Sequence, residues 1–382
     1  METSRRRMFF FYLIVSLVLC FALSACGDDP KGGSGSSVLY SLPEDHRLHT
    51  QSLYQNSRSM DWLYFTGTVN DAVSGDLYGF EVNIFQVFPE GVEEFVYRTD
   101  MAISDVARQR FVFKSVVTFN APELRFDPVA GENVWEYDDE GVWISHRERS
   151  DIWEISVNNG KQGANRMEID LVLTNESRGY YPETPNGIIE MGRCETGNTT
   201  DMIGLSYYYS HPRLSTAGSF LLENRTISVQ GVTWFDHQWG NFNHCPTNWD
   251  WFSLRFNNGA YMMLFNFNEA GDNETPVLEK RAAAYFFSHN ANSYWKGPDA
   301  FQITPLRTYT STVNGKKFRV DWLLTTPAGT FAVTPYFDEQ VIDDPEDPYY
   351  EGIIEVREGS LQGPVVGNGY IETSFSTTAN PN

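Results

Sequence analysis

The sequence is short of cysteine and of positive charge, and both shortages narrow what the protein can be. Its 382 residues include only 4 cysteines, two of which, Cys20 and Cys26, lie near the N-terminus. A disulfide framework of the kind that holds small secreted domains together is therefore excluded. Lys and Arg number 28 against 50 Asp and Glu, for a formal net charge of −22. A nucleic-acid binder needs a basic surface, so no nucleic-acid partner is expected.

Common catalytic and cofactor motifs are also missing. The stretch GLSYYY at Gly204 lacks the second glycine of a nucleophile elbow, and no glycine loop suited to phosphate follows a predicted strand. No CxxC or HExxH spacing occurs, so neither a metal nor a cofactor is predicted. The acidic run Asp343–Gly352 contains prolines and lacks EF-hand spacing, which favours a solvated loop over a calcium site.

Long apolar runs are confined to the N-terminus. Arg5, Arg6 and Arg7 precede an apolar stretch that ends in Leu-Ser-Ala-Cys at Cys26. This pattern predicts a secretory signal peptide over residues 1–25 rather than a membrane span. The last four residues resemble a bacterial lipobox, so we expect Cys26 to be lipidated; the alternative is an ordinary cleaved signal with a spare thiol. Residues 26–40 are rich in Gly and Ser and would form a flexible tether.

These N-terminal features predict a location. A lipidated Cys26 would anchor the protein to a membrane of the bacterial cell envelope, and Gly27 in the following position favours the outer membrane. No later apolar run is long enough to span a bilayer, so the remainder is expected to fold in water.

The remainder is predicted to be all-β. Alternating apolar residues, many of them β-branched or aromatic, recur between turn signals such as Asn257-Asn258-Gly259. The clearest strand candidates are 61–69, 78–88, 168–174, 250–256, 260–267, 319–326 and 352–359. The only helical candidate is a brief one around Ser104–Gln109. Many short strands at this spacing indicate sandwiches or barrels.

Two cysteines remain in the body. In an oxidising envelope Cys194 and Cys245 are expected to form a disulfide. Two free thiols, or a metal site that includes His244, remain as alternatives.

Several motifs together resemble one family. The most specific is GVTWFDHQWGNF at Gly231–Phe242, preceded by YYYSHPRLSTAGSF at Tyr207–Phe220 and followed by WDWFSLRFNNGAYMMLF at Trp249–Phe265. With DWLYFTG at Asp61–Gly67 and further pieces in order, they resemble the AttH-like and carotenoid 1,2-hydratase family over roughly residues 45–376.

The resemblance implies two packed lipocalin-like β-barrel domains with an apolar pocket. We place the first domain at residues 41–242 and the second at residues 243–382. In this family some members hydrate carotenoid polyenes and fungal relatives direct pericyclic ring closures, whereas many bacterial members have no known reaction. The resemblance therefore supports a prediction of the fold more strongly than a prediction of the activity.

The motif around His237 suggests a site. In a strand, Phe235, His237 and Trp239 would share one face and form an aromatic wall with one imidazole. The family's hydratases line their substrate tunnel with this histidine and tryptophan. Tyr207 and Tyr209 are candidates to point polar tips into the same pocket. The alternative is that all of these side chains only fill the core.

The catalytic candidates are His237 and Asp236, although Asp236 would lie on the opposite strand face. Hydration of an alkene needs a strong proton donor, and a carboxylic acid kept neutral in an apolar wall can serve. The hydratases carry a Tyr-x-Asp on the strand after the tryptophan motif. Here the aligned residues read Leu264-Phe265-Asn266, so the acid is replaced by an amide, and Asn266 is expected to contact ligand rather than donate a proton.

Two classes of function follow. The first is an anchored protein that binds an apolar, isoprenoid-like or lipid-like molecule in a β-barrel. The second is an enzyme of the same shape that hydrates, isomerises or cyclises a polyene-like substrate. The missing acid and the anchor favour binding or an unknown reaction, and a structural scaffold in an envelope complex is a third option.

Overall fold

The computed structural model describes thirteen stretches of the chain. They are residues 46–51, 54–55, 57–89, 91–177, 179–180, 187–194, 202–242, 247–269, 283–288, 292–297, 299–344, 348–374 and 377–378. Within them the protein is all-β, as predicted, apart from short 3₁₀ turns such as η3 at Gly163–Asn165. In this part of the chain no helix is long and apolar enough to cross a membrane. Residues 1–45 lie outside it, so the signal peptide and the lipidation of Cys26 stay predictions.

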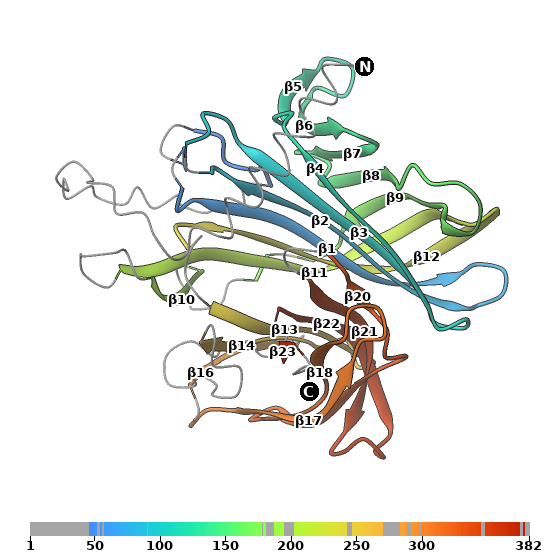
Figure 1. Cartoon of the computed structure of the whole chain (residues 1–382), viewed down its shortest axis with the longest axis vertical. Helices are drawn as coiled ribbons and strands as arrows, with labels where there is room; N and C mark the ends of the chain where they lie inside the picture. The colour runs from blue at the N-terminus through green and yellow to red at the C-terminus, as the bar shows by residue number, and fades with distance from the viewer. Residues whose placement is uncertain are drawn as a thin grey trace.

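Twelve strands form the first curled sheet, which is the upper one in Figure 1. In chain order they are β1 (Met60–Asp71), β2 (Leu77–Val87), β3 (Val96–Asp105), β4 (Arg110–Thr118), β5 (Glu123–Asp127), β6 (Glu132–Asp139), β7 (Val142–Arg147), β8 (Ile152–Asn158), β9 (Met167–Asn175), β10 (Ile188–Cys194), β11 (Met202–Leu222) and β12 (Arg225–Gly240). Their order across the sheet is β4-β3-β2-β1-β12-β11-β9-β8-β7-β6-β5, and β10 pairs with β11.

Eleven strands form the second curled sheet, which lies below the first in Figure 1. They are β13 (Thr247–Phe256), β14 (Tyr261–Glu269), β15 (Ala283–Phe287), β16 (Asn292–Lys296), β17 (Gln302–Thr310), β18 (Lys316–Thr326), β19 (Gly329–Pro335), β20 (Val341–Ile342), β21 (Tyr349–Glu358), β22 (Val365–Thr373) and β23 (Thr377–Thr378). The order is β16-β15-β14-β13-β22-β21-β19-β18-β17, with β20 beside β21 and β23 beside β18.

The two sheets share a strand order. In each, the first four strands run outward in sequence, and the first strand pairs with a long strand near the end of the domain, β1 with β12 and β13 with β22. The remaining long strands follow in descending order on the other side. The chain is therefore a topological duplication that its sequence does not display.

The strand predictions are confirmed, but the helical one is wrong. All seven candidate segments fall on strands β1, β2, β9, β13, β14, β18 and β21. At the helical candidate, Ser104 and Asp105 end β3, and the next four residues turn the chain into β4, where the Gln109 N–H donates to the Val106 carbonyl at 3.2 Å. Gln109 takes a positive φ of 49°, which ends any helix.

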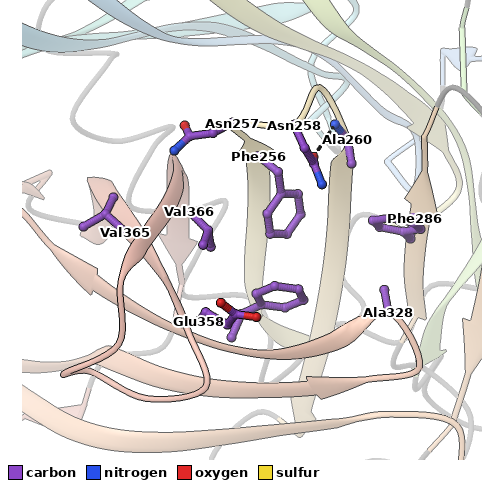
Figure 2. Close-up of a pocket in the computed structure, with 10 residues that line it drawn as sticks. Phe256, Asn257, Asn258, Ala260, Phe286, Ala328, Glu358, Val365 and Val366 are labelled. Atoms are coloured by element: carbon purple, nitrogen blue, oxygen red, sulfur yellow. Dashed lines mark hydrogen bonds between the residues drawn. The ribbon is translucent and has the colours of Figure 1, made fainter.

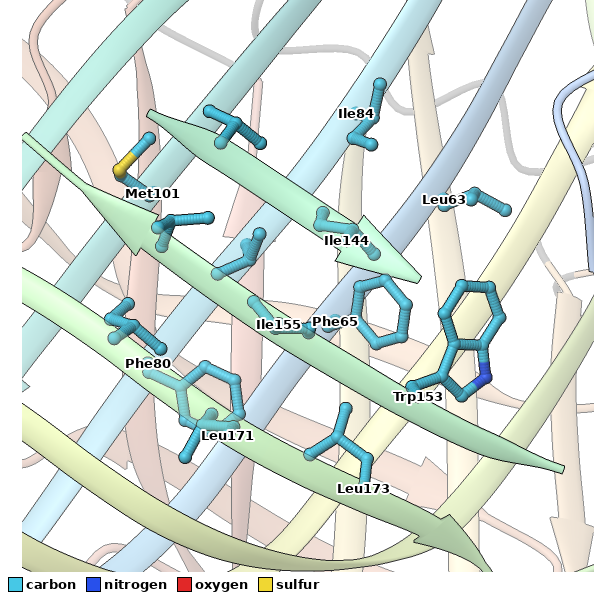
Figure 3. Packing of buried hydrophobic residues seen from close by; sticks show 14 of the residues in the cluster. Leu63, Phe65, Phe80, Ile84, Met101, Ile144, Trp153, Ile155, Leu171 and Leu173 are labelled. Carbon is cyan, nitrogen blue, oxygen red and sulfur yellow. The ribbon is translucent and has the colours of Figure 1, made fainter. Parts of the chain in front are cut away.

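Each sheet curls around its own apolar interior. Large apolar side chains from facing strands fill the first interior, among them Phe65, Trp153 and Leu171 (Figure 3). Phe252, Leu254 and Trp322 lie in the second. Alternate residues of the same strands face the other way, as a period of two requires. Burial of these two faces is the main stabilising term of the fold.

A third buried layer joins the two domains. It is aromatic, and Trp62, Tyr64 and Trp234 of the first sheet meet Trp251 and Phe265 of the second. Polar groups cross the same boundary: the Tyr64 hydroxyl donates to Glu351 Oε1 at 2.7 Å. The Tyr349 hydroxyl lies 2.9 Å from both Glu81 Oε1 and Asp100 Oδ2. Burial raises the pKa of Glu81 and of Glu351 well above its usual range, so these acids are held in the neutral form.

Candidate functional site

Five of the proposed site residues share one face of two paired strands. Tyr207 lies opposite Trp239, and Tyr209 lies opposite His237, in the β11–β12 register, with Phe235 two residues further along β12. The Tyr207 and Trp239 rings stack at 5.4 Å with a 19° angle between their planes. Alternation therefore brings Tyr207, Tyr209, Phe235, His237 and Trp239 together in one aromatic wall. His211 lies opposite Phe235 on the same face, so the wall holds more than the one imidazole that was expected.

The neighbouring strand β1 adds a carboxylate to this wall. Asp61 lies opposite Trp239 and Leu63 lies opposite His237, so the Asp61 side chain reaches the imidazole diagonally. Asp61 Oδ1 accepts a hydrogen bond from His237 Nε2 at 2.9 Å. Both side chains are buried, with 2% and 0% of their surface exposed. A buried carboxylate of this kind fixes the tautomer and the orientation of the imidazole that it faces.

A second histidine, His49, holds the other oxygen of Asp61. Its backbone N–H and its Nδ1 donate to Asp61 Oδ2 at 2.7 and 2.6 Å. Its ring stacks on Trp239 at 4.9 Å. Burial by itself would raise the pKa of Asp61, but the charges and hydrogen bonds of His49 and His237 lower it to about 2. Asp61 is therefore ionised at every physiological pH.

Tyr209 connects this group to three more histidines. Its hydroxyl lies 3.2 Å from His237 Nδ1 and 2.6 Å from His46 Nδ1. The His46 ring lies 4.7 Å from that of His146 and 5.2 Å from that of His211. Burial, and then the neighbouring His146 and His211, lower the pKa of His46 well below its usual range. The first domain thus gathers five of the chain's seven histidines around one tyrosine.

Asp151 anchors the far end of the network. Its Oδ1 accepts a hydrogen bond from His146 Nε2 at 3.0 Å, and its Oδ2 accepts one from Asn175 Nδ2 at 2.6 Å. Burial would raise its pKa, but the hydrogen bonds of His146 and Asn175, with the charge of His46, lower it to about 2.

Two groups of three residues in the described part of the chain have ligand atoms close enough for a metal ion. They are His46, His146 and Asp151, and His49, Asp61 and His237, with the ligand atoms of each group within 4.8 Å of one another. Metal-motif spacing did not indicate either group, because the ligands come from separated segments.

Asp236 does not belong to this site. It lies on the opposite face of β12, where its Oδ1 accepts hydrogen bonds from Ser210 Oγ at 2.5 Å and Trp234 Nε1 at 2.7 Å. Burial raises its pKa to about 7. Asp236 and His237 therefore do not share a site, because successive strand residues point to opposite faces and Asp236 faces the layer between the domains.

Asn266 does not reach the wall either. It lies on β14 in the second domain, where its Nδ2 donates to Asp250 Oδ2 at 2.8 Å. Its neighbours on that strand face, Met262 and Leu264, belong to the interior of the second sheet. The expectation that Asn266 joins His237 in one pocket is corrected by this placement. The side chain of Cys194 and the whole of Cys245 lie outside the described residues, so their disulfide stays a prediction.

The second domain has a cavity of its own. It has a volume of about 340 Å³ and opens at the end of the sheet where β13 turns into β14 (Figure 2). Its walls are mainly aromatic and aliphatic, from Phe256, Phe286, Phe331 and Val366, with Glu358 as a charged group. It is separate from the histidine network of the first domain.

Sequence patterns predict only His237 and Tyr209 of this network. They give no role to Asp61, His46, His49, His146, Asp151 and His211, although Asp61 lies in the DWLYFTG motif. Strand alternation could have indicated Asp61. It lies on the same face of β1 as Leu63 and Phe65, so it is an acidic residue on an otherwise apolar strand face. The loop histidines had no comparable signal.

Fold and site together define a class: a two-domain, all-β, lipocalin-like protein with a buried Asp–His–Tyr network in its first domain. The chain belongs to the AttH-like family, whose model matches residues 35–374. No curated protein matches the sequence well enough to serve as a relative.

Three solved structures share the fold. An AttH-type protein from Nitrosomonas europaea is 20% identical, with a TM-score of 0.65 over 83% of this chain and 92% of that one. Kievitone hydratase from Nectria haematococca is 17% identical, with a TM-score of 0.55 over 82% and 89%. CghA, in complex with Sch210972, is 13% identical, with a TM-score of 0.53 over 82% and 88%. At these identities the likeness shows the fold alone.

Proposed function

We propose that this protein is a lipid-anchored enzyme of the bacterial cell envelope that catalyses proton transfer on an apolar substrate carrying one oxygen function. The reaction would be of the hydration, dehydration or isomerisation type. The observation that carries the proposal is the buried chain from Asp61 through His237 to the Tyr209 hydroxyl, with spacings of 2.9 and 3.2 Å. A network that only filled a core would not need an ionised carboxylate behind an imidazole.

The hydrogen bonds that link Asp61, His237 and Tyr209 have a defined direction. Ionised Asp61 accepts the Nε2–H of His237, so a neutral His237 presents its Nδ1 lone pair to Tyr209. Tyr209 can then give its proton to His237, or receive one from it, while Asp61 stabilises the imidazolium that forms. This is the carboxylate–imidazole–hydroxyl arrangement that general acid–base catalysis uses.

Trp239 indicates what the substrate carries. Its indole N–H is buried and has no hydrogen-bond partner among the described residues, although the rings of His49 and Tyr207 both stack against the indole. A buried donor without a partner costs free energy, and a substrate oxygen would relieve that cost. The aromatic rings around it would hold an apolar body.

The solved neighbours support this reaction class, because one is named a hydratase. The mechanism of the carotenoid hydratases is not part of this proposal. Where the carotenoid hydratases carry an acid, this chain has Asn266, which donates a hydrogen bond to Asp250 in the second domain. The proton would instead come from the Tyr209–His237 pair.

Deuterium exchange tests the proposal. The detergent-solubilised protein is incubated in D₂O with a lipid extract of the envelope, and mass spectrometry follows deuterium entering lipid species. We expect enzyme-dependent incorporation that His237→Gln and Tyr209→Phe abolish. Asp250→Asn, in the second domain, is the matched control and should retain it. Incorporation that survives in both first-domain variants would overturn the assignment.

Anchoring is tested separately. Cys26→Ala should release the protein into the soluble fraction, because the lipid carries the anchor. A variant that stays with the membrane after salt and carbonate washing would contradict the lipoprotein assignment.

Binding without turnover is the second candidate, and the cavity lined by Phe256, Phe286 and Phe331 favours it. At about 340 Å³ it lies near the lower end of small-molecule sites. A protein that binds retinoic acid, shows no exchange, and loses binding in Phe331→Ala but not in His237→Gln would be a carrier rather than an enzyme.

A further inference from the structure

The proposed proton transfer does not explain the part of the network that consists of His46, His146 and Asp151. His46 precedes β1, His146 lies on β7, and Asp151 ends the turn between β7 and β8 with a φ of 52°. Their ligand atoms converge: Asp151 Oδ1 lies 3.0 Å from His146 Nε2 and 3.6 Å from His46 Nε2. A tetrahedral zinc ion with bonds of about 2.1 Å needs ligand atoms about 3.4 Å apart. The observed spacings lie on either side of that value.

Tautomers fix where the His46 lone pair points. Asp61 takes the Nε2–H of His237, so His237 Nδ1 accepts the Tyr209 O–H. The Tyr209 oxygen must then accept the Nδ1–H of His46, at 2.6 Å. A neutral imidazole that donates from Nδ1 carries its lone pair at Nε2. That lone pair therefore faces the Asp151 carboxylate, an arrangement that is repulsive unless a cation lies between the two.

The surroundings of the group also suit a metal ion. Metal-binding histidines generally donate their second ring N–H to a neighbouring acceptor, as His46 does to Tyr209. Asn175 holds the other oxygen of Asp151 at 2.6 Å, which fixes the carboxylate. The His46 and His146 side chains are 10% and 2% exposed, whereas Asp151 is 36% exposed. An ion could therefore approach from the Asp151 side and be enclosed by the imidazoles.

The neighbouring group of His49, Asp61 and His237 is less suited to a metal ion. Both of its imidazoles donate an N–H to Asp61, at 2.6 and 2.9 Å, whereas Asp151 accepts an imidazole N–H from His146 alone, at 3.0 Å. A metal ion at Asp61 would therefore have to displace two imidazole protons, and one at Asp151 only the proton on His146.

We propose that His46, His146 and Asp151 bind one divalent transition-metal ion, with zinc as the best match. Two imidazoles and one carboxylate suit zinc or iron, and three protein ligands leave a coordination position open, as in catalytic rather than structural sites. An ion on His46 Nε2 would strengthen the hydrogen bond from His46 Nδ1 to Tyr209. The ion would therefore stand directly behind the proposed proton path.

Metal titration tests the site. The full chain is solubilised in detergent, its thiols are alkylated, and His244 and His289 are replaced by Ala in every form to remove other ligands. After treatment with chelator, Zn²⁺ binding is measured by calorimetry and Co²⁺ binding by visible absorption. We expect one ion per chain, with a Co²⁺ spectrum of nitrogen and oxygen ligands.

Variants locate the ion. Asp151→Asn and His146→Ala should weaken Zn²⁺ binding by more than about 100-fold, and Asn175→Ala by about 10- to 100-fold, as for the loss of a group that orients a ligand. His49→Ala, in the neighbouring group, should bind Zn²⁺ like the parent. Zn²⁺ should raise the melting temperature of the parent but not of Asp151→Asn, which checks that each variant is folded.

Three outcomes would overturn the proposal. They are the absence of stoichiometric binding in the parent, binding that Asp151→Asn and His146→Ala leave intact, and binding that His49→Ala removes. None of these measurements depends on turnover, so the proposed reaction could fail while the metal site stands.

Discussion

The first strand of each domain carries an aspartate followed by a tryptophan in its first half, Asp61-Trp62 on β1 and Asp250-Trp251 on β13, and the two aspartates have different neighbours. Asp61 on β1 and Asp250 on β13 both face a sheet interior, while Trp62 and Trp251 face the layer between the domains. Asp61 lies between the imidazoles of His49 and His237. Asp250 accepts hydrogen bonds from the Asn266 amide and the Thr373 hydroxyl, at 2.8 and 3.0 Å.

The difference shows how a duplicated fold can confine chemistry to one copy. Amides and aliphatic hydroxyls satisfy a buried carboxylate but do not change their charge near neutral pH, whereas imidazoles can. Asn266 and Thr373 are therefore neutral partners of Asp250, whereas Asp61 has partners suited to the proposed proton transfer. The second domain retains the scaffold, and its apolar cavity lies at the other end of its first strand, where β13 turns into β14.

The largest expected effect comes from exchanging the two carboxylates for amides. Asp61→Asn should reduce the rate of deuterium exchange by about 10²- to 10⁴-fold, because the imidazole loses the charge that orients it and stabilises its protonated form. Asp250→Asn should change the rate by less than about threefold. Equal losses in the two variants would mean that the domains contribute alike and that Asp61 has no special role.

The next largest effect concerns one tryptophan from each interior. Trp322→Ala, in the packed second interior, should lower the free energy of unfolding by about 3–5 kcal/mol. Trp239→Ala should cost less, because the polar rings of His49, His237 and Tyr207 surround it. It should nevertheless abolish binding of retinoic acid.

Paired melts and titrations check this contrast between the interiors. A strongly lowered melting temperature in Trp239→Ala, with undiminished probe affinity in the folded fraction, would show that the wall around His237 only fills space.

A smaller effect is expected for Asp236, which lies in the layer between the domains and not in either sheet interior. Burial raises the pKa of Asp236 to about 7, so the folded state holds its proton more tightly than the unfolded state. The resulting stabilisation is complete at low pH and is lost as pH rises from about 4 to 7, by roughly 1 kcal/mol per pH unit. Asp236→Asn should remove this part of the pH dependence.

The measurement is the difference in unfolding free energy between the parent and Asp236→Asn at several pH values. The difference isolates Asp236 from Glu81 and Glu351, whose pKa values are also raised and which remain in both proteins. A constant difference across this range would contradict a protonated Asp236.

The smallest effect should be the same in both domains. Gly75, between β1 and β2, and Gly259, between β13 and β14, have φ values of 78° and 83°. Alanine at either position should cost about 1–2 kcal/mol, because the left-handed conformation strains any residue with a Cβ. Chemical denaturation of Gly75→Ala and Gly259→Ala should give similar losses. Clearly unequal losses would show that the two first hairpins are not equivalent.

Much of the architecture follows from the sequence alone. Period-two alternation places Phe235, His237 and Trp239 on one face and Asp236 on the other, because strand geometry fixes side-chain direction locally. Asn257-Asn258-Gly259 sets the turn into β14 for the same local reason. The motif around His237, together with those at Tyr207–Phe220, Trp249–Phe265 and Asp61–Gly67, indicates the family.

Only the tertiary structure decided which groups meet. Asp61 and His237 are 176 residues apart, and their contact depends on β1 pairing with β12 rather than with another strand. His46 and His49 come from a segment without regular structure, and alternation gives no information about where such residues lie. The separation of Asn266 from the first-domain site depends on which sheet its strand joins. Strand pairing over such distances is set by global packing of apolar faces, and a single strand's sequence does not encode its partner.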